Sequence, residues 1–489
     1  MVATLAMLAP AAFAQAPTPK VTINGLFDLS LSVSKNWSDL DLTRPNDQGA
    51  YSRQRGRFDI TGEVGKSKAV WGLELDFSNG AGVTAPGNSA AFDLDTDVAG
   101  VVETKWLYLE VPLTGTGAMI PMPVESTLRG GAQPAAGHSY KFGLLWSGDF
   151  PGFNVSTKWA PNVQSTLTYA QIQERVFTTT ANESWALLAS LEVEPFKGLA
   201  IKPTYTFASY DGGNPGTLNL GIEAKNGFSP TTAGGGDLRT ERHTFGAEAR
   251  WTAGPFSLVP TFWIQLGDQE IPGGGEADIQ SWLADVEAGL RFGPLNLRGK
   301  FMWTPGMDAN DCVVTSAACP FPGGDDIKYY QAINPGFIVA AGGFTEIQTS
   351  NIEYNTALLG GAPGLSLRQS PSYDKYGRIF AAFRADYAIT PAYTLYGVVN
   401  ASWTDEKVDT SGTVSATGIT SPDGRGNARY LGTELNVGQI WRFAPSVTLD
   451  TIFAYMFAGD ALNQAPVAGG PTKDAEDIYK LIARIRYTF

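Results

Sequence analysis

The chain has 489 residues, of which 56 are glycine, and 11% of residues are aromatic but only 17% are charged. Beyond the N-terminus no stretch approaches the roughly 18 to 20 uninterrupted apolar residues of a membrane helix, which excludes helical membrane spans. The mean hydropathy of −0.09 is compatible with a transmembrane β-barrel, because only every second residue of such a strand faces lipid. The formal net charge of −13 indicates little about the fold.

The first fourteen residues, 1–14, predict a secretory signal peptide. Val2 to Ala14 is an apolar run that ends in Ala12-Phe13-Ala14, a pattern that favours cleavage before Gln15. The basic segment that normally opens such a signal is missing, because no Lys or Arg precedes Lys20. An apolar N-terminal strand or helix is the alternative, which Pro10 and the alanine-rich composition disfavour.

Alternation of apolar and polar residues with a period of two predicts strands along the rest of the chain. Lys20 to Val33 is the first, and Ser52 to Val64 forms a hairpin with Lys68 to Ser78 around Gly65-Lys66-Ser67. Most later hairpins have turns that contain glycine or proline, which are typical of strand ends. The further strands are predicted at Val101 to Val111, Ser139 to Trp146, Phe153 to Trp159, Val163 to Gln173, Trp185 to Val193, Leu199 to Phe207, His243 to Trp251, Phe256 to Leu266, Trp282 to Phe292, Leu295 to Trp303, Arg378 to Ala388, Tyr393 to Trp403, Tyr430 to Phe443, Val447 to Phe457 and Asp477 to Phe489.

The C-terminal strand, Asp477 to Phe489, alternates almost without fault. From Tyr479 onward its odd-numbered positions are apolar or aromatic, and its even-numbered positions include Lys480, Arg484 and Arg486, so one face suits lipid and the other suits water. A terminal strand that ends in Phe489, with Tyr487 two places earlier, resembles the C-terminal signature of Gram-negative outer-membrane β-barrels, which the barrel-assembly machinery recognises. The resemblance implies that Tyr487 and Phe489 are the assembly signal.

These segments predict an all-β fold, a transmembrane antiparallel up-and-down β-barrel of about eighteen strands. Sixteen strands would result if the hairpin Phe153 to Gln173 belonged to a loop. Short turns at one end and long polar connections at the other are typical of outer-membrane barrels, in which the short turns face the periplasm. Strand parity then places Pro112 to Gly137 on the periplasmic side. A β-propeller or two stacked β-domains is the alternative, but neither fold requires a final strand of this kind.

Residues 15–489 are therefore expected to form one barrel domain, with a long external loop at about 305–371. A structureless loop of that length is unusual, and its apolar stretch Phe337 to Ala341 would be costly to leave in water, so we expect it to pack into or over the barrel mouth. The loop contains both cysteines, Cys312 and Cys319. Their close spacing in an exported protein favours a disulfide over a metal site, because no His or third Cys lies nearby.

No catalytic site and no cofactor are predicted. Nucleophilic catalysis needs a base, usually His, and the chain has two, His138 and His243. We interpret both as interfacial polar residues, which disfavours a barrel hydrolase. Phosphate-binding loops with GKS or GKT, zinc patterns and haem-attachment motifs are not present in the sequence.

Charged residues on the predicted inward face are the main functional signal. Arg53, Arg55 and Arg57 follow one another along the second strand, and closure of the barrel places the last strand on the other side of the first. Ladders of charge can control ion selectivity in a water-filled pore. The alternative is that the arginines only pair with neighbouring carboxylates and stiffen the wall. The predicted pore-lining residues are Arg53, Arg55, Arg57, Arg378, Arg384, Arg442, Lys480, Arg484, Arg486, Asp28, Asp59, Glu74 and Asp76.

Across essentially its whole mature length the chain resembles Gram-negative porins, by pattern and not by a diagnostic motif. Its length and the segments Gly432 to Asn436 and Phe457 to Asp460 are also similar to large substrate-specific channels, including the eighteen-stranded alginate export proteins. The resemblance implies passive or facilitated diffusion of hydrophilic solutes. The constriction departs from the general pattern, in which the third external loop enters the lumen, because that loop would here be only about Trp146 to Gly152.

We therefore expect an integral protein of the bacterial outer membrane, a water-filled channel for small hydrophilic solutes, with any preference for anions left open. The expected partners are outer-membrane lipid and lipopolysaccharide, the solutes and the barrel-assembly machinery, and not nucleic acid. The sequence is compatible with a monomer or a homotrimer. The alternatives are a polysaccharide exporter on the same fold and a barrel scaffold that surrounds a partner, such as an electron-transfer conduit.

Overall fold

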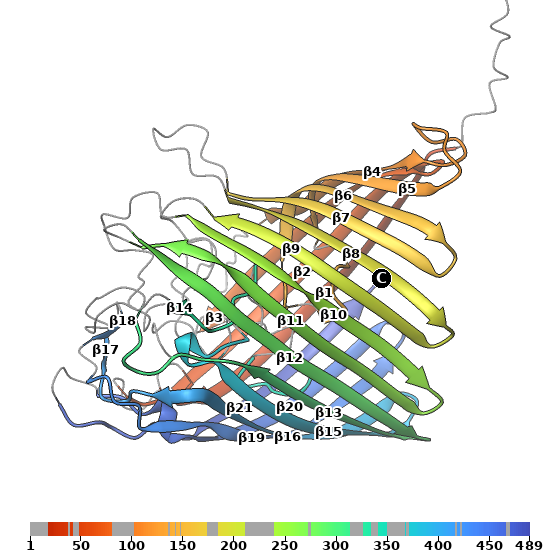
Figure 1. The fold of residues 1–489 in the computed structure, drawn as a ribbon. Helices are drawn as coiled ribbons and strands as arrows, with labels where there is room; N and C mark the ends of the chain where they lie inside the picture. The colour runs from red at the N-terminus through yellow and green to blue at the C-terminus, as the bar shows by residue number, and fades with distance from the viewer. Residues whose placement is uncertain are drawn as a thin grey trace, which may run out of the picture.

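The computed structural model describes residues 18–37, 40–42, 48–80, 102–134, 137–141, 143–146, 148–173, 184–210, 239–271, 275–312, 326–333, 341–349, 367, 371–415, 418–420, 423–465 and 470–489. Within these residues eighteen strands form a closed antiparallel barrel, which confirms the predicted fold (Figure 1). The predicted signal segment, 1–14, lies outside the described residues. No helix in the described part of the chain is long and apolar enough to cross a membrane.

The strands of the barrel have 10 to 17 residues. At about 3.3 Å per residue and a tilt near 45°, even the shortest crosses about 23 Å, close to the height of the apolar band of an outer-membrane barrel. They are β1 (Lys20–Lys35), β2 (Gln48–Val64), β3 (Ser67–Gly80), β4 (Val102–Thr114), β5 (Glu125–Pro134), β6 (Asp149–Ala160), β7 (Val163–Gln173), β8 (Ser184–Phe196), β9 (Leu199–Tyr210), β10 (Thr240–Ala253), β11 (Phe256–Glu270), β12 (Glu276–Phe292), β13 (Leu295–Thr304), β15 (Arg378–Thr390), β16 (Tyr393–Val408), β19 (Ala428–Ala444), β20 (Val447–Ala458) and β21 (Ile478–Thr488).

Short elements lie in the connections between these strands. The strand β14 (Asp326–Ile327) pairs in parallel with β12, and β17 (Thr413–Ser415) pairs with β18 (Gly418–Thr420) as a small separate hairpin. Two single 3₁₀ turns, η2 (Asp374–Tyr376) and η3 (Asp460–Leu462), precede β15 and follow β20.

The last strand closes the barrel on the first. β21 pairs with β1 over ten residue pairs, from Leu26 opposite Thr488 to Lys35 opposite Tyr479, without a register shift. This closure leaves no open edge, which would otherwise expose a row of unpaired backbone groups.

Tight turns lie at one end of the barrel and long connections at the other, to the right and the left of Figure 1 respectively. Seven hairpins at the short-turn end have turns of two residues, for example 65–66 between β2 and β3. The turn 115–124 between β4 and β5 is longer and exposes Met119, Ile120 and Met122. This asymmetry matches the one that the sequence predicts for an outer-membrane barrel.

The outer face is apolar because side chains alternate along each strand. In β1, Val21, Ile23 and Phe27 are exposed on the outside, whereas Asp28 and Ser30 on the other face are buried. Exposed aromatic side chains recur toward the short-turn end, as expected for the aromatic girdle at a membrane interface. They include Trp159, Phe196, Trp251, Phe292, Trp441 and Phe443.

One predicted strand, Ser139 to Trp146, is wrong. The fifth strand of the barrel is β5, which pairs with β4 and with β6. Its outward positions include Gly130 and Ala132, so the alternation that marks a lipid-facing strand is weak there. Half of the predicted periplasmic stretch, Pro112 to Gly137, is consequently barrel wall, and residues 115–124 form the turn between β4 and β5 at the short-turn end.

The third long connection is also different from the prediction. It spans 135–148 between β5 and β6, and not Trp146 to Gly152. Its described residues lie inside the barrel, where Leu144 and Leu145 are fully or almost fully buried. The chain therefore does place its third long connection in the lumen, as general porins do.

The segment 305–377 between β13 and β15 contributes two further pieces to the interior, 326–333 and 341–349. A buried apolar cluster joins these pieces to the third connection and to the wall. Because most inward positions of the wall are polar, the connections supply much of this interior core. Its members include Leu144, Leu145, Trp146, Leu188, Trp263, Leu283, Met302, Tyr330, Ile333, Phe344 and Phe380.

Candidate functional site

The described residues 137–141 and 143–146 lie against the inner wall formed by β7 to β12. His138 is buried, and its ring nitrogens are hydrogen-bonded to Ser190 Oγ at 3.0 Å and to Thr168 Oγ1 at 2.7 Å. Burial, with a smaller contribution from the charge of Lys202, lowers the pKa of His138 to about 3. The imidazole is therefore neutral at pH 7 and holds the segment to the wall. The interpretation of His138 as an interfacial residue is wrong.

Two carboxylates of the wall hold the next residues of this segment. Glu248 accepts hydrogen bonds from Ser139 Oγ at 2.8 Å and from the following backbone amide at 2.6 Å. Lys141 forms an ion pair with Asp285, and Lys300 Nζ approaches the same carboxylate at 2.7 Å. Burial lowers the pKa of Lys141, and the charge of Asp285 opposes that shift. A buried pair of this kind is costly to break, because the remaining charge would lose its partner.

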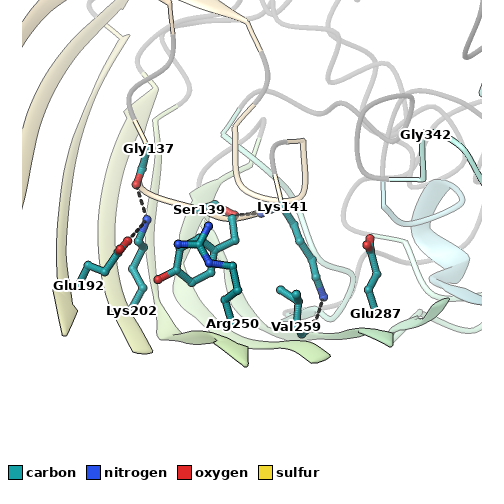
Figure 2. Close-up of a pocket in the computed structure, with 10 residues that line it drawn as sticks. Gly137, Ser139, Lys141, Glu192, Lys202, Arg250, Val259, Glu287 and Gly342 are labelled. Carbon is teal, nitrogen blue, oxygen red and sulfur yellow. Dashed lines mark hydrogen bonds and ion pairs between the residues drawn. The ribbon is translucent and has the colours of Figure 1, made fainter. Parts of the chain in front are cut away.

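Tyr140 lies at a cavity of about 660 Å³ between this segment and the wall (Figure 2). The Lys202 ammonium is 4.1 Å and the Arg250 guanidinium carbon 4.6 Å from the centre of its ring, so the aromatic face contacts two cations. Burial and the nearby carboxylate of Glu192 raise the pKa of Tyr140 well above its usual range, so its hydroxyl stays protonated. The charged residues that line the cavity are Lys141, Glu192, Lys202, Arg250 and Glu287.

Figure 2 shows how the two sides of the cavity differ. Ser139 and Lys141 come from the third connection, whereas Glu192, Lys202 and Arg250 project from the adjacent strands β8, β9 and β10. Lys202 Nζ contacts Glu192 at 2.8 Å and donates to the carbonyl oxygen of Gly137 at 2.8 Å. The cavity thus combines a wall of mixed charge with a segment that the same charges hold in place.

The residues 341–349 lie on a different part of the inner wall, where Glu434 of β19 binds them. Glu434 accepts hydrogen bonds from the backbone amides of Glu346 at 2.6 Å and Ile347 at 3.0 Å and from the hydroxyl of Thr345. Charge-assisted bonds of this type are roughly twice as strong as neutral ones. One carboxylate therefore fixes a whole turn of the segment.

Neighbouring strands add to this contact. Arg384 Nη1 donates to the carbonyl oxygen of Gly343 and Asn400 Nδ2 to that of Phe344, each at 2.8 Å. Lys480 Nζ lies 3.8 Å from a carboxylate oxygen of Glu346. The long connection is thus held by residues of β15, β16, β19 and β21.

The arginines predicted along the second strand face the lumen, as the register requires. Arg55 and Arg57 both pair with Glu74 of β3, with Arg55 Nη2 at 3.2 Å, and Lys105 Nζ lies 3.4 Å from the same residue. Arg53 is buried. Lys105 Nζ also lies 3.3 Å from Asp149, so the three cations at Glu74 share at least two carboxylates.

The last strand places its cations next to acidic residues of its two neighbours. Arg484 pairs with Asp450 of β20, and Arg486 pairs with Asp28 of β1. Lys480 is buried, with its ammonium 3.5 Å from the ring centre of Trp37. These pairings agree with the alternative in which charges stiffen the wall, and a role in permeation stays a prediction.

The remaining predicted residues lie in several different settings. In β15 Arg378 is fully buried, and Arg384 pairs with Asp386 at 2.6 Å. Asp59 of β2 accepts a hydrogen bond from Trp106 Nε1 at 2.9 Å. Arg442 of β19 is exposed close to the short-turn end. Asp76 lies in β3, but its side chain lies outside the described part of the structure.

Of the two cysteines, Cys312 is buried and disulfide-bonded, and Cys319 lies outside the described residues. The pairing of Cys312 with Cys319 stays a prediction. Among the described residues no group of three or more His, Cys, Asp and Glu side chains could hold a metal ion. His243 is on the outer face, with Nδ1 2.8 Å from the hydroxyl of Tyr205.

Sequence analysis did not single out the cavity residues Tyr140, Glu192, Lys202 and Arg250. The last three occupy inward positions of strands that it predicted correctly, so side-chain parity was a usable signal for them. Tyr140 had no such signal, because its segment was taken for a strand.

Comparison with known proteins gives the fold and not a family assignment. No protein-family model and no curated protein matches the chain. The structure is similar to a BenF-like porin from Pseudomonas fluorescens Pf-5, with 8% identity, a TM-score of 0.52 and coverage of 96% of this chain and 98% of that chain. It is also similar to OccK5 (OpdH) of Pseudomonas aeruginosa, with 11% identity, a TM-score of 0.49 and coverage of 96% and 98%. The fold is therefore that of the large barrels known from outer-membrane porins.

Proposed function

We propose that the protein is an outer-membrane porin, a water-filled channel through which small hydrophilic solutes diffuse. The observation that carries this proposal is the charged cavity inside a closed barrel, next to residues 137–146 of the chain's own third connection. A lumen with charged walls and a local constriction can sort solutes by size and charge without a chemical step. No catalytic role is assigned to any residue.

The membrane location rests on the two faces of the wall. An apolar outer face with aromatic side chains toward the short-turn end suits lipid, and the polar inner face suits water. We place the short-turn end in the periplasm and the long connections outside the cell, in contact with lipopolysaccharide. The barrel-assembly machinery would insert the chain through its C-terminal strand. A homotrimer and a monomer are both compatible with this arrangement.

The charges that line the cavity bear on which solutes the channel favours. The cavity is lined by three cationic side chains, Lys141, Lys202 and Arg250, and by two carboxylates, Glu192 and Glu287. Lys141 is already paired with the buried Asp285, whereas Arg250 is exposed. Lys202 is buried and paired with Glu192 as well, so we propose a mild preference for anions that depends mainly on Arg250.

The alternatives have less support. A scaffold that surrounds a protein partner, or an exporter of a polymer, needs a wide lumen. Here residues 137–146 and 341–349 lie within the lumen and are bonded to its wall. Either alternative would require both segments to move.

Reconstitution into planar lipid bilayers tests the proposal. The folded protein is expected to produce discrete conductance steps, and protein that has been unfolded by heating is the control. Swelling of liposomes in neutral sugars of increasing size would then give the size limit. A barrel that is folded by its heat-modifiable migration in gel electrophoresis, but that gives no conductance and no solute entry, would contradict the channel function.

A further inference from the structure

Arg242 of β10 is a buried cation under the segment 326–333. Its side chain is 2% exposed, and its guanidinium carbon lies 4.6 Å from the ring centre of Tyr210. Nη1 donates to two neutral oxygens of Gln331, to Oε1 at 2.7 Å and to the carbonyl oxygen at 3.3 Å. Among the described residues none of the ion pairs includes Arg242. A buried charge in a protein normally has a counter-charge, because its transfer from water is costly.

Hydrogen-bond donors without acceptors accumulate around this guanidinium. Arg242 Nη2, Gln331 Nε2, the Tyr330 hydroxyl and Trp263 Nε1 are all buried and have no hydrogen-bond partner in the described structure. These four residues are close in the fold. Gln331 accepts a hydrogen bond from Arg242 and directly follows Tyr330 in the chain. Tyr330 in turn stacks on Trp263, with ring centres 6.5 Å apart. Buried donors in native proteins are nearly always satisfied, so this group requires an acceptor.

Two acceptor side chains of the surrounding wall, those of Gln265 and Glu248, are already in use. Gln265 Oε1 accepts the backbone amide of Gln331 at 3.1 Å, and Gln265 Nε2 donates to the carbonyl oxygen of the same residue at 2.8 Å. Glu248, the next carboxylate on the same strand face, lies six residues away, about 20 Å along the strand at about 3.3 Å per residue. It is bonded to the third connection and to Thr261.

We propose that a small inorganic monovalent anion, of which chloride is the natural example, binds between Arg242 and Gln331. A spherical acceptor with a full negative charge satisfies several donors at once and neutralises the guanidinium. It would also join residues 326–333 to β10 and β11. The site is structural and separate from the cavity at Tyr140, so it does not depend on the selectivity of the channel.

Bromide can replace chloride and is located by its anomalous scattering. The protein is refolded, purified and crystallised with bromide as the sole halide, because a buried site exchanges slowly. An anomalous peak is expected at hydrogen-bond distance from Arg242 Nη2. Arg384 is an internal control, since its guanidinium pairs with Asp386 at 2.6 Å and should have no peak. Density without an anomalous signal beside Arg242 would identify a water and overturn the proposal.

Two variants separate the site from general effects of halide. Arg242→Gln removes the charge, and Gln331→Leu removes the donor on the opposite side and leaves Arg242 in place. The peak is expected to vanish in the first and to fall in occupancy in the second. A full peak that persists in Gln331→Leu would exclude the shared site even if Arg242→Gln failed to fold.

Solution measurements supply an independent readout. Amide hydrogen exchange of residues 326–333 is compared in chloride and in gluconate at equal ionic strength. We expect exchange at least about tenfold faster in gluconate for the natural protein, because a ligand that binds only the closed state protects it by mass action. The Arg242→Gln variant should exchange equally fast in both salts. Equal exchange in the natural protein would overturn the proposal.

Discussion

Phe489 lies against Gly25 at the seam of the barrel. The two residues exchange two backbone hydrogen bonds, of 3.0 and 3.1 Å, so the last residue of the chain is paired with the first strand. A Cβ atom on Gly25 would approach Cζ of the Phe489 ring to 2.7 Å and the carbonyl oxygen of Arg57 to 2.5 Å. Glycine therefore provides the space that the terminal ring occupies.

We expect Gly25→Val to weaken closure of the barrel. The added methyl groups would displace the ring and the neighbouring backbone, and such overpacking costs about 1 to 3 kcal/mol. The fraction of protein that keeps its compact, heat-modifiable migration in gel electrophoresis should fall. Gly62→Val is the matched control, since Gly62 lies on the adjacent strand with no atom within 4 Å of its added Cβ. Equal losses in both variants would contradict this explanation.

Replacement of Phe489 by Asp tests the assembly signal itself. The ring centre lies 6.1 Å from Phe27, 6.0 Å from Phe58 and 5.7 Å from Tyr487, so the substitution removes the shared member of a cluster of four aromatic rings at the seam. We expect the amount of protein in the outer membrane to fall severalfold. Channels that do insert should keep their normal single-channel conductance, because the ring faces away from the lumen. Normal membrane levels of Phe489→Asp would count against the signal.

Glu434 is expected to control the position of residues 341–349. Glu434→Leu removes the acceptor for the amides of Glu346 and Ile347, and each hydrogen bond to a charged group contributes about 1.5 to 3 kcal/mol. The segment should detach, and single-channel conductance should rise and fluctuate more. Glu434→Gln keeps a carbonyl acceptor and should have a smaller effect. If the Leu variant folds normally and conducts as the natural protein does, the segment does not restrict the pore.

The barrel could be predicted from the sequence because each strand has a local pattern, the alternation of apolar and polar side chains with a period of two. The exception shows the limit of that signal. β5 has Gly130 and Ala132 at outward positions and so lacks an apolar face, whereas Tyr140 and Leu144 alternate like strand residues in a connection that enters the lumen. Apolar and polar residues alternate to some degree in both segments. Only the hydrogen-bonding of β5 to β4 and β6 distinguishes the strand from the connection.

The functional site could be predicted only in part. Parity gave the inward direction of Arg55, Arg57 and Arg484, but it cannot tell which inward residues a connection covers. Lys480 is buried beside Glu346, which lies more than a hundred residues earlier in the chain. No local sequence pattern relates Glu346 to the last strand. Contacts between connections and wall are set by tertiary packing, and a single sequence does not contain them in readable form.

Arg250 is expected to determine a large part of the ion selectivity. Arg250→Glu changes the charge of the side chain by two units. At the dielectric constant of water this changes the interaction energy with a monovalent ion about 8 Å away by about 1 kcal/mol. This energy disfavours an anion and favours a cation, so the ratio of anion to cation permeability should fall by up to about thirtyfold at low salt, where screening is weak. Arg250→Lys keeps the charge and should change the ratio little. Reversal potentials in a salt gradient measure this ratio, and an unchanged value in Arg250→Glu would place the conducting path elsewhere.

The last prediction concerns pH and the third connection. The pKa of His138 is lowered from 6.5 to about 3 by burial, with a contribution from Lys202. Above pH 6.5 the imidazole is neutral whether the segment is bound or released, so the contact contributes fully. As the pH falls below 6.5, the released segment takes up a proton and the bound one does not. The bound state is therefore destabilised between pH 6.5 and about 3, by about 3 kcal/mol at pH 4.

We expect amide hydrogen exchange of residues 137–146, corrected for the intrinsic effect of pH, to become faster at pH 4.5 than at pH 7.5. The strands should stay protected, because they do not depend on this contact. Glu248 and Asp285 bind the same segment, so the contribution of the histidine must be measured separately. His138→Gln cannot take up the proton and should lose most of the pH dependence down to pH 5. If the variant and the natural protein had the same pH profile, protonation of His138 would not be what releases the segment.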